Sequence, residues 1–299
     1  MEGVTLLAVG SIHYGYWAYN MALSLKYHSD IKIQLVCDSI ALSGLKYKGL
    51  FDYITLMKQD HYIRKTLEPG LAKINLYEYL IFDDTIYFDA DAVCVKDVKP
   101  LFKINAEYAT QVFDEVRKGD GLHKNMRWQT TGKIWERYSL DEDAVLPATN
   151  TSFQLIRKGA TAEKIYKDAK DAIGNSWKWQ ELALRWGRST AQPDELYFNI
   201  SLAKNGFKKV GEPVLFTTPQ TKLMNLKTIE DNYYVIGYYG DEGLNAKFVR
   251  QLYDKLISKY SREYIKHHQQ YKFHQLIKNK FLTKNVRVQK KQAKTTASK

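Results

Sequence analysis

The chain has 299 residues, of which 44% are hydrophobic, and a formal net charge of +12. This apolar content is enough for a hydrophobic core, so the composition excludes a chain that is disordered throughout. The length predicts one large α/β domain with an extension. No apolar run approaches the roughly 20 residues that span a bilayer, and the N-terminus lacks a basic leader, so we expect a cytoplasmic protein without a secretion signal or integral membrane anchor.

The N-terminal part alternates apolar runs with helical patterns. Such alternation predicts a parallel sheet covered on both faces, with ligands bound outside the carboxyl ends of its strands. The two cysteines, Cys37 and Cys94, lie in strand-like runs, which predicts buried free thiols and a reducing compartment. The predicted strands are 4–10, 31–38, 51–57 and 83–91, and the predicted helices are 13–29, 41–50 and 71–82.

The pattern weakens over residues 103–147, which are rich in charge and aromatics and are typical of a lid or a binding loop. Five tryptophans between Asp91 and Asp194 predict either an acceptor site or core packing. They are Trp128, Trp135, Trp177, Trp179 and Trp186. Later elements are expected as strands at 150–156, 214–219 and 233–240, and as helices at 162–173 and 195–206.

Positive charge is concentrated in the tail. Residues 247–299 hold 15 Lys and Arg against two acids, whereas the first 246 residues hold 30 basic and 31 acidic side chains. We therefore expect a domain at 1–246 and a basic amphipathic helical tail at 247–299, disordered after Lys284. The tail has three interpretations: peripheral binding to an anionic membrane, binding to DNA, or a helix packed on the domain with solvated lysines.

Two aspartates, Asp89 and Asp91, come directly after the apolar, β-prone run 86–88. Aspartate is depleted in strands because its side chain competes for backbone hydrogen bonds, so a metal ion, a substrate or solvent at the strand end must compensate. One residue of separation lets both carboxylates face one point, and hard oxygen ligands suit Mg²⁺ or Mn²⁺. Surface acids that simply close a strand are the alternative.

The stretch LAKINLYEYLIFDDTIYFDADAVCVKDVKPLF, residues 71–102, resembles the donor-binding segment of GT-A-fold nucleotide-sugar glycosyltransferases of the glycogenin and lipopolysaccharide galactosyltransferase type. The resemblance covers most of residues 4–240 and implies a Rossmann-like, mostly parallel α/β sheet with flanking helices. It implies that Asp91 is the stronger metal ligand, that Asp89 is shared between metal and donor ribose, and that Ala90 also lies against the donor. Lys73 matches the basic residue that reaches the diphosphate or sugar; a solvated lysine at a helix start is the alternative.

Two further stretches resemble the nucleotide-binding part of that family. LLAVGSIHY implies backbone contacts from Ala8 and Gly10 and stacking of Tyr14 on a uracil base. Asp38, at the end of the second strand, is also implied in donor binding. A helix-cap aromatic is the alternative for Tyr14.

The stretches TNTSFQLI and PDELYFNISL resemble the family's sugar-binding segments. They imply Asn150 near the donor sugar, with Asp194 and Glu195 lining the transferred sugar and acting in catalysis. The alternatives are an ordinary turn residue for Asn150 and a helix N-cap for Asp194.

One position departs from the resembled family. The usual metal-binding histidine is replaced by Gly237, and the lysine that follows it by Gly243. Tyr238, Asp241 or water are possible substitutes, or two acids and the diphosphate hold the metal, as is common for Mg²⁺.

The resemblance implies a metal-dependent transferase that moves a sugar, expected to be a hexose, from a UDP-sugar with retention of configuration. We expect front-face transfer; a covalent route through Asp194 or Glu195 competes. The expected acceptor is a glycolipid, a polysaccharide or a modified DNA base. The alternatives are an inactive scaffold that binds nucleic acid or a membrane, and a dehalogenase-type phosphatase. That phosphatase family places its acid pair after the first strand, and Val93 stands where it has Thr or Gly.

Overall fold

The computed structural model describes residues 1–45, 48–58, 62–63, 66–67, 69–120, 133–174, 194–210, 214–217, 226–237, 255 and 257–258. The basic tail apart from residues 255, 257 and 258 therefore lies outside the described residues, as do Tyr238, Asp241, Gly243 and all the tryptophans named above except Trp135. Within the described part, no helix is both long and apolar enough to cross a membrane.

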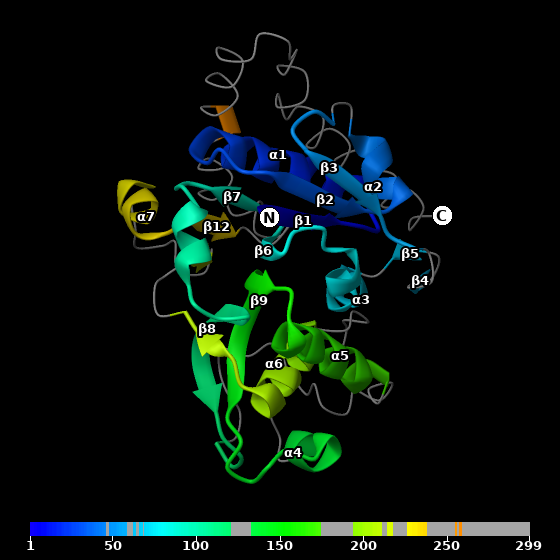
Figure 1. Cartoon of the computed structure of the whole chain (residues 1–299), viewed down its shortest axis with the longest axis vertical. Helices are drawn as coiled ribbons and strands as arrows, with labels where there is room; N and C mark the ends of the chain where they lie inside the picture. Colours follow the sequence, from blue (N-terminus) through cyan, green and yellow to red (C-terminus); the bar gives the residue numbers. More distant parts are fainter. Residues whose placement is uncertain are drawn as a thin grey trace, which may run out of the picture.

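A seven-stranded sheet forms the body of the protein (Figure 1). Four of its six strand pairings are parallel and the two that involve β9 with β6 and β8 are antiparallel, which confirms the predicted mostly parallel α/β class. In spatial order the strands are β10 (Lys208–Lys209), β8 (Tyr108–Val116), β9 (Leu146–Arg157), β6 (Asp84–Asp89), β1 (Glu2–Ala8), β2 (Ile33–Cys37) and β3 (Tyr53–Leu56).

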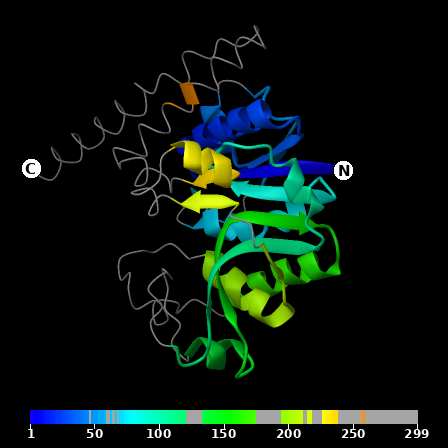
Figure 2. The same cartoon turned by 90° about the vertical axis from the view of Figure 1, so that its left-hand side faces the viewer.

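Helices cover both faces of this sheet. The helices are α1 (Ile12–His28), α2 (Ser39–Gly44), α3 (Pro69–Ile74), α4 (Lys133–Tyr138), α5 (Ala160–Gly174), α6 (Asp194–Asn205) and α7 (Leu226–Asn232), with short 3₁₀ turns η2 (Leu76–Tyr79) and η3 (Lys99–Lys103). Figures 1 and 2 both place α4 at the end of the molecule away from α1, where β8 and β9 extend beyond the rest of the sheet.

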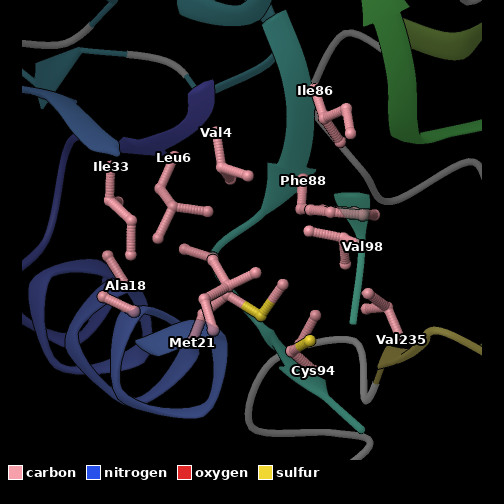
Figure 3. Close-up of a cluster of buried hydrophobic side chains, with 14 of the residues drawn as sticks. Val4, Leu6, Ala18, Met21, Ile33, Ile86, Phe88, Cys94, Val98 and Val235 are labelled. Carbon is pink, nitrogen blue, oxygen red and sulfur yellow. The ribbon is translucent and has the colours of Figure 1, made fainter. Parts of the chain in front are cut away.

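The alternation of side chains along the strands divides the core in two. Leu6 of β1 faces α1, while the next residue, Leu7, belongs to the cluster formed with α3, α5 and α6. Phe88 and Tyr87 of β6 divide in the same way. Figure 3 shows Met21 of α1 packed in the first of these clusters, beside residues of β1, β2 and β6. This two-sided burial is what an alternating strand and helix pattern predicts.

A second, three-stranded sheet lies beside the acid pair. Its strands are β11 (Leu215–Thr217), β12 (Val235–Gly237) and β7 (Ala92–Cys94), and β7 begins directly after Asp91. A third sheet contains only β4 (Tyr62–Ile63) and β5 (Thr66–Leu67). Both cysteines are free and buried, and burial raises the pKa of each thiol to about 12.

Two sequence predictions were wrong. Residues 103–147 are not a single loop, because β8 and α4 lie within them. The predicted helix 71–82 breaks at Asn75, whose side-chain amide donates to the carbonyl of Leu71 at 2.8 Å and so competes with the helical hydrogen bonds. The chain continues as η2 instead.

Candidate active site

The carboxyl ends of β1, β2 and β6 meet at one edge of the sheet because these three strands are parallel. Asp38, which follows β2, joins two of the loops there. Its Oδ2 accepts a hydrogen bond from the backbone N–H of Gly10 at 2.8 Å, and its Oδ1 accepts one from Ala41 at 2.8 Å as the N-cap of α2. Asp38 is buried and therefore fixes the loop after β1, where Gly10 adopts a φ of +80°.

The other predicted nucleotide-binding residues lie on the same loop and the first turn of α1. Ala8 is buried and pairs with Cys37. Ser11 caps α1 by accepting from the N–H of His13. Tyr14 is half-buried, with its ring edge-on to that of Trp17 at 5.0 Å between centroids. The residues predicted to bind the base therefore lie close together at this edge of the sheet.

Lys73 is the centre of a buried charge cluster. Its Nζ lies 2.8 Å from Asp89 Oδ1, 2.8 Å from Asp194 Oδ2 and 3.2 Å from Thr151 Oγ1. Its side chain is only 9% exposed, so the solvated alternative is wrong. Lys73 also lies in the last turn of α3, not at a helix start, where the helix dipole favours a cation.

The two carboxylates keep Lys73 charged. Burial lowers the pKa of a lysine, but the attraction of Asp194 and Asp89 outweighs burial and holds the pKa of Lys73 well above its ordinary value. Because the ammonium has three N–H donors and three acceptors surround it, its hydrogen-bonding capacity is used. The cluster is therefore a triad in which one ammonium is paired with two carboxylates.

Asp89 is also held by two hydroxyl groups. Tyr87 donates to its Oδ1 and Ser152 to its Oδ2, each at 2.5 Å. Burial raises the pKa of Asp89, but the charge of Lys73 and these hydrogen bonds outweigh burial and lower it below the ordinary value. Burial, reinforced by the negative charge of Asp89, raises the pKa of Tyr87 well above its ordinary value, so the phenol stays a donor.

An irregular pairing in β9 aims Thr151 and Ser152 at the cluster. Thr110 of β8 pairs with Gln154 of β9, and Val112 of β8 pairs with Thr149 of β9. A step of two residues along β8 thus corresponds to a step of five residues along β9. The extra residues of β9 form a bulge, which changes the direction in which side chains point. Thr151 consequently donates to Asp194 Oδ2 at 2.5 Å while its neighbour Ser152 reaches Asp89.

The remaining predicted residues lie around this cluster. Asn150 is buried in the bulge, and its Oδ1 accepts from the N–H of Ser152 at 3.0 Å, so it is a strand residue and not an ordinary turn residue. Asp194 and Glu195 form the first turn of α6, and both are partly exposed. Ala90 is buried and Asp91 is half-buried directly after β6.

The residues at the acid pair fit a divalent ion only if other ligands complete it. A carboxylate offers about four lone-pair sites, and Asp89 already accepts from Lys73, Tyr87 and Ser152. Gly237 pairs with Ala92, the residue after Asp91, so the position that carries histidine in the resembled family does lie beside the acids but brings no side chain. Within the described residues, no three His, Cys, Asp or Glu side chains gather into a metal site. Asp89 keeps one lone pair for an ion, Asp91 would supply a second hard oxygen ligand, and phosphate and water would have to complete the set.

Trp135 does not line the candidate active site. It is 2% exposed, packs in the core and donates from its indole N–H to the carbonyl of Ala144 at 3.4 Å. Core packing, one of the two alternatives for the tryptophans, therefore holds for this residue.

Solved structures of glycosyltransferases share the fold of this chain. The galactosyltransferase LgtC in complex with donor and acceptor sugar analogues matches with a TM-score of 0.57 and 12% identity, over 87% of this chain and 96% of that one. The chain has a GT-A glycosyltransferase fold. An active-site mutant of LgtC matches with a TM-score of 0.52 and 12% identity over the same shares, and the bifunctional glycosyltransferase WbbM with 0.52 and 9%, over 85% of this chain and 49% of that one.

By sequence, no protein-family model and no curated protein matches the chain. The GT-A fold is therefore shown by the course of the backbone, and its charge cluster lies where strands of such a sheet end. Sequence reasoning missed Tyr87, Thr151 and Ser152. Two signals pointed to them: a tyrosine two residues before Asp89, on the same side of the strand, and a run of small polar residues in an otherwise buried strand.

Proposed function

We propose that the protein is a metal-dependent glycosyltransferase that transfers a hexose from a UDP-sugar with retention of configuration. The observation that carries the proposal is the triad of Lys73, Asp89 and Asp194 at the carboxyl ends of the parallel strands of a GT-A fold. Charged groups buried at this edge suit a phosphorylated ligand because a crevice outside the strand ends is where open α/β sheets bind such ligands.

Each part of the site has a role in the proposal. The loop from Ala8 to Tyr14, fixed by Asp38, binds the nucleoside through backbone groups and the Tyr14 ring. Asp89 and Asp91 hold Mg²⁺ or Mn²⁺ together with the donor, and the ion, when bound, offsets the charge that develops on the departing diphosphate.

Lys73 places a positive charge beside the transferred sugar and the diphosphate, since it is ionised and held between two acids. Asn150, Asp194 and Glu195 line the sugar and orient it.

Retention without a covalent intermediate agrees with the state of Asp194. Its Oδ2 accepts from Lys73 and from Thr151, and a carboxylate engaged by two donors is a weaker nucleophile. Front-face transfer is therefore favoured over the covalent route through Asp194, and a route through Glu195 is left to the experiment. Trapping with a slow fluorinated donor separates the two: a mass increase on a peptide that contains residues 194–195 would establish the covalent route.

Hydrolysis of the donor tests the proposal. Purified protein is incubated with UDP-glucose or UDP-galactose and Mn²⁺, and release of UDP is compared with that of Asp91→Asn, which keeps the shape of the side chain but loses its charge. We expect release by the wild type and a reduction of at least about 100-fold in the variant, the scale of an essential electrostatic group. Absence of both binding and turnover with every UDP-sugar would leave the inactive scaffold as the remaining hypothesis.

The acceptor is proposed from the charge of the chain. The tail at 247–299 is basic and would attract an anionic partner. That partner is either an anionic membrane that carries a glycolipid or a DNA that carries a modified base. Deleting residues 260–299 and measuring retention on anionic liposomes and on duplex DNA, at low and moderate salt, separates these partners. Ile257 is buried and belongs to the hydrophobic cluster that lies on the α1 side of the sheet, so the deletion begins beyond a residue that packs on the domain. Unchanged retention on both would contradict a binding role of the tail.

A further inference from the structure

The ammonium of Lys73 has the surroundings of a bound cation. Asp89, Asp194 and Thr151 contribute one oxygen each, at 2.8, 2.8 and 3.2 Å. The ring of Tyr87 adds a cation–π contact, with its centroid 5.5 Å from Nζ. Two carboxylates, a hydroxyl and an aromatic face therefore neutralise one buried positive charge.

Lys73 and a divalent ion would share one ligand. Asp89 has one lone-pair site left after Lys73, Tyr87 and Ser152, so an ion that binds there lies close to the ammonium. Two cations so close repel each other, and the repulsion is strong because the site is largely buried. A diphosphate brings negative charge that can face both cations at once and remove this repulsion.

We propose that Lys73 acts as an internal counter-ion of Asp89, which keeps the affinity for a free divalent cation low and makes tight cation binding depend on the nucleoside diphosphate. The inference rests on the proposed function and concerns the order in which the site fills. Coupling of this kind is reciprocal: the cation and the diphosphate each raise the affinity for the other by the same factor.

Two consequences follow, and the second distinguishes this role from simple binding of the donor by Lys73. Removing the ammonium leaves the partly buried Asp89 and Asp194 without their cation, so the folded protein loses stability. The same change removes the repulsion, so a free divalent ion binds more tightly. A lysine that only binds the donor phosphates would leave the affinity for the free ion unchanged.

The test is titration of Mn²⁺ into the full-length protein, with free Mn²⁺ measured by electron paramagnetic resonance, with and without UDP. Wild type, Lys73→Met and Lys73→Arg are compared with Lys26→Met. Lys26 is the matched control because its Nζ lies 2.7 Å from Asp52 in an ion pair away from the site. We expect Lys73→Met to bind Mn²⁺ without UDP at least about tenfold more tightly than wild type, whereas Lys73→Arg and Lys26→Met bind as wild type does.

Thermal unfolding gives a second measurement. Mn²⁺ without UDP should raise the melting temperature of Lys73→Met by more than that of wild type, because binding to the folded state stabilises it by an amount that grows with affinity. Unchanged or weaker Mn²⁺ binding by Lys73→Met would overturn the inference. Should that variant fail to fold, the wild type decides, since equal Mn²⁺ affinity with and without UDP also overturns it.

Failure of this inference is distinguishable from failure of the proposed function. A protein that binds neither UDP nor UDP-sugars contradicts both. A protein that binds and turns over a UDP-sugar, but whose Mn²⁺ affinity does not respond to Lys73→Met, contradicts only the counter-ion role.

Discussion

Replacing Tyr87 with phenylalanine isolates the hydrogen bond that holds Asp89. The Tyr87 hydroxyl donates to Asp89 Oδ1 at 2.5 Å, and the side chain is 1% exposed, so the substitution removes one oxygen and keeps the packing of the ring. Hydrogen bonds to charged groups contribute about 1.5–3 kcal/mol. Because Asp89 keeps Lys73 and Ser152, we expect the lower half of this range: a loss of about 2 kcal/mol in the free energy of unfolding at pH 7.

The same substitution has a defined pH dependence. The folded-state pKa of Asp89 is lowered mainly by Lys73, with a contribution from this hydrogen bond, against the opposing effect of burial. A depressed carboxyl pKa contributes stability above the unfolded value, about 3.9, and loses it as the pH falls through the folded value. The cost of Tyr87→Phe should accordingly be full at pH 7 and should shrink below about pH 4.

Urea unfolding at several pH values measures this cost, and Tyr108→Phe is the matched control. Tyr108 is 2% exposed, and its hydroxyl is buried without a hydrogen-bond partner in the described part of the chain. Its removal should change the free energy of unfolding by less than about 0.5 kcal/mol, or stabilise the fold slightly. Donor hydrolysis should fall about tenfold in Tyr87→Phe, the equivalent of 1.4 kcal/mol in the transition state. Equal costs for the two variants, or a cost of Tyr87→Phe that does not decrease at all as the pH is lowered below about 4, would refute the reasoning.

Three further outcomes follow from other contacts. Asp38→Ala leaves the N–H groups of Gly10 and Ala41 unpaired and should cost about 2 kcal/mol in urea unfolding, while weakening UDP binding measured by calorimetry. Arg157→Met removes a guanidinium that donates to three backbone carbonyls and pairs with Asp84, and should cost about 3 kcal/mol at unchanged m-value; a cost below 1 kcal/mol would contradict this. Both thiols are buried with pKa values of about 12, so Ellman's reagent should label neither in the native protein at pH 8 and both in urea.

The central strands were predictable because each is a short, mostly apolar run. Residues 4–8 and 33–37 are buried on both faces of the sheet, which favours apolar side chains in succession and leaves a clear pattern in the sequence. The one polar residue in each run, Thr5 or Gln34, is buried, and the Thr5 hydroxyl donates to Gln34 Oε1. The aspartates at their ends were predictable for the same reason, since each interrupts such a run where a strand must stop. The sheet edge, and with it the place of the candidate site, thus follows from local pattern alone.

The strand β8 was missed because its pattern changes along its length. Its first half is buried, whereas residues 113–115 are exposed or half-buried, and one of them, Phe113, is a large apolar side chain exposed at 39%. Neither alternation nor an apolar run is complete in such a strand. Its identity as a strand depends on its pairing with β9, which lies more than 30 residues further along the chain, and distant pairing leaves no local mark.

The same dependence explains why Thr151 and Ser152 were missed. Strict alternation would send these neighbours to opposite faces of the sheet, yet the bulge in β9 lets both reach the charge cluster. The bulge is defined by a register between two strands, so it becomes visible only in the folded protein. Tyr87 and Asp89, two residues apart in a regular strand, could be paired from the sequence because period 2 places them on one side.

The composition of the cluster favours a functional origin over a stabilising one. A buried ion group is costly to desolvate, and replacement of such groups by apolar residues is often neutral or stabilising, so stability alone is a weak reason to keep Lys73, Asp89 and Asp194. The triad is also unbalanced, since one ammonium faces two carboxylates. A cluster built only for stability would be neutral. One that carries an excess of negative charge at a strand end, with a lysine already in place for phosphate, is suited to receive a divalent ion and a nucleoside diphosphate together.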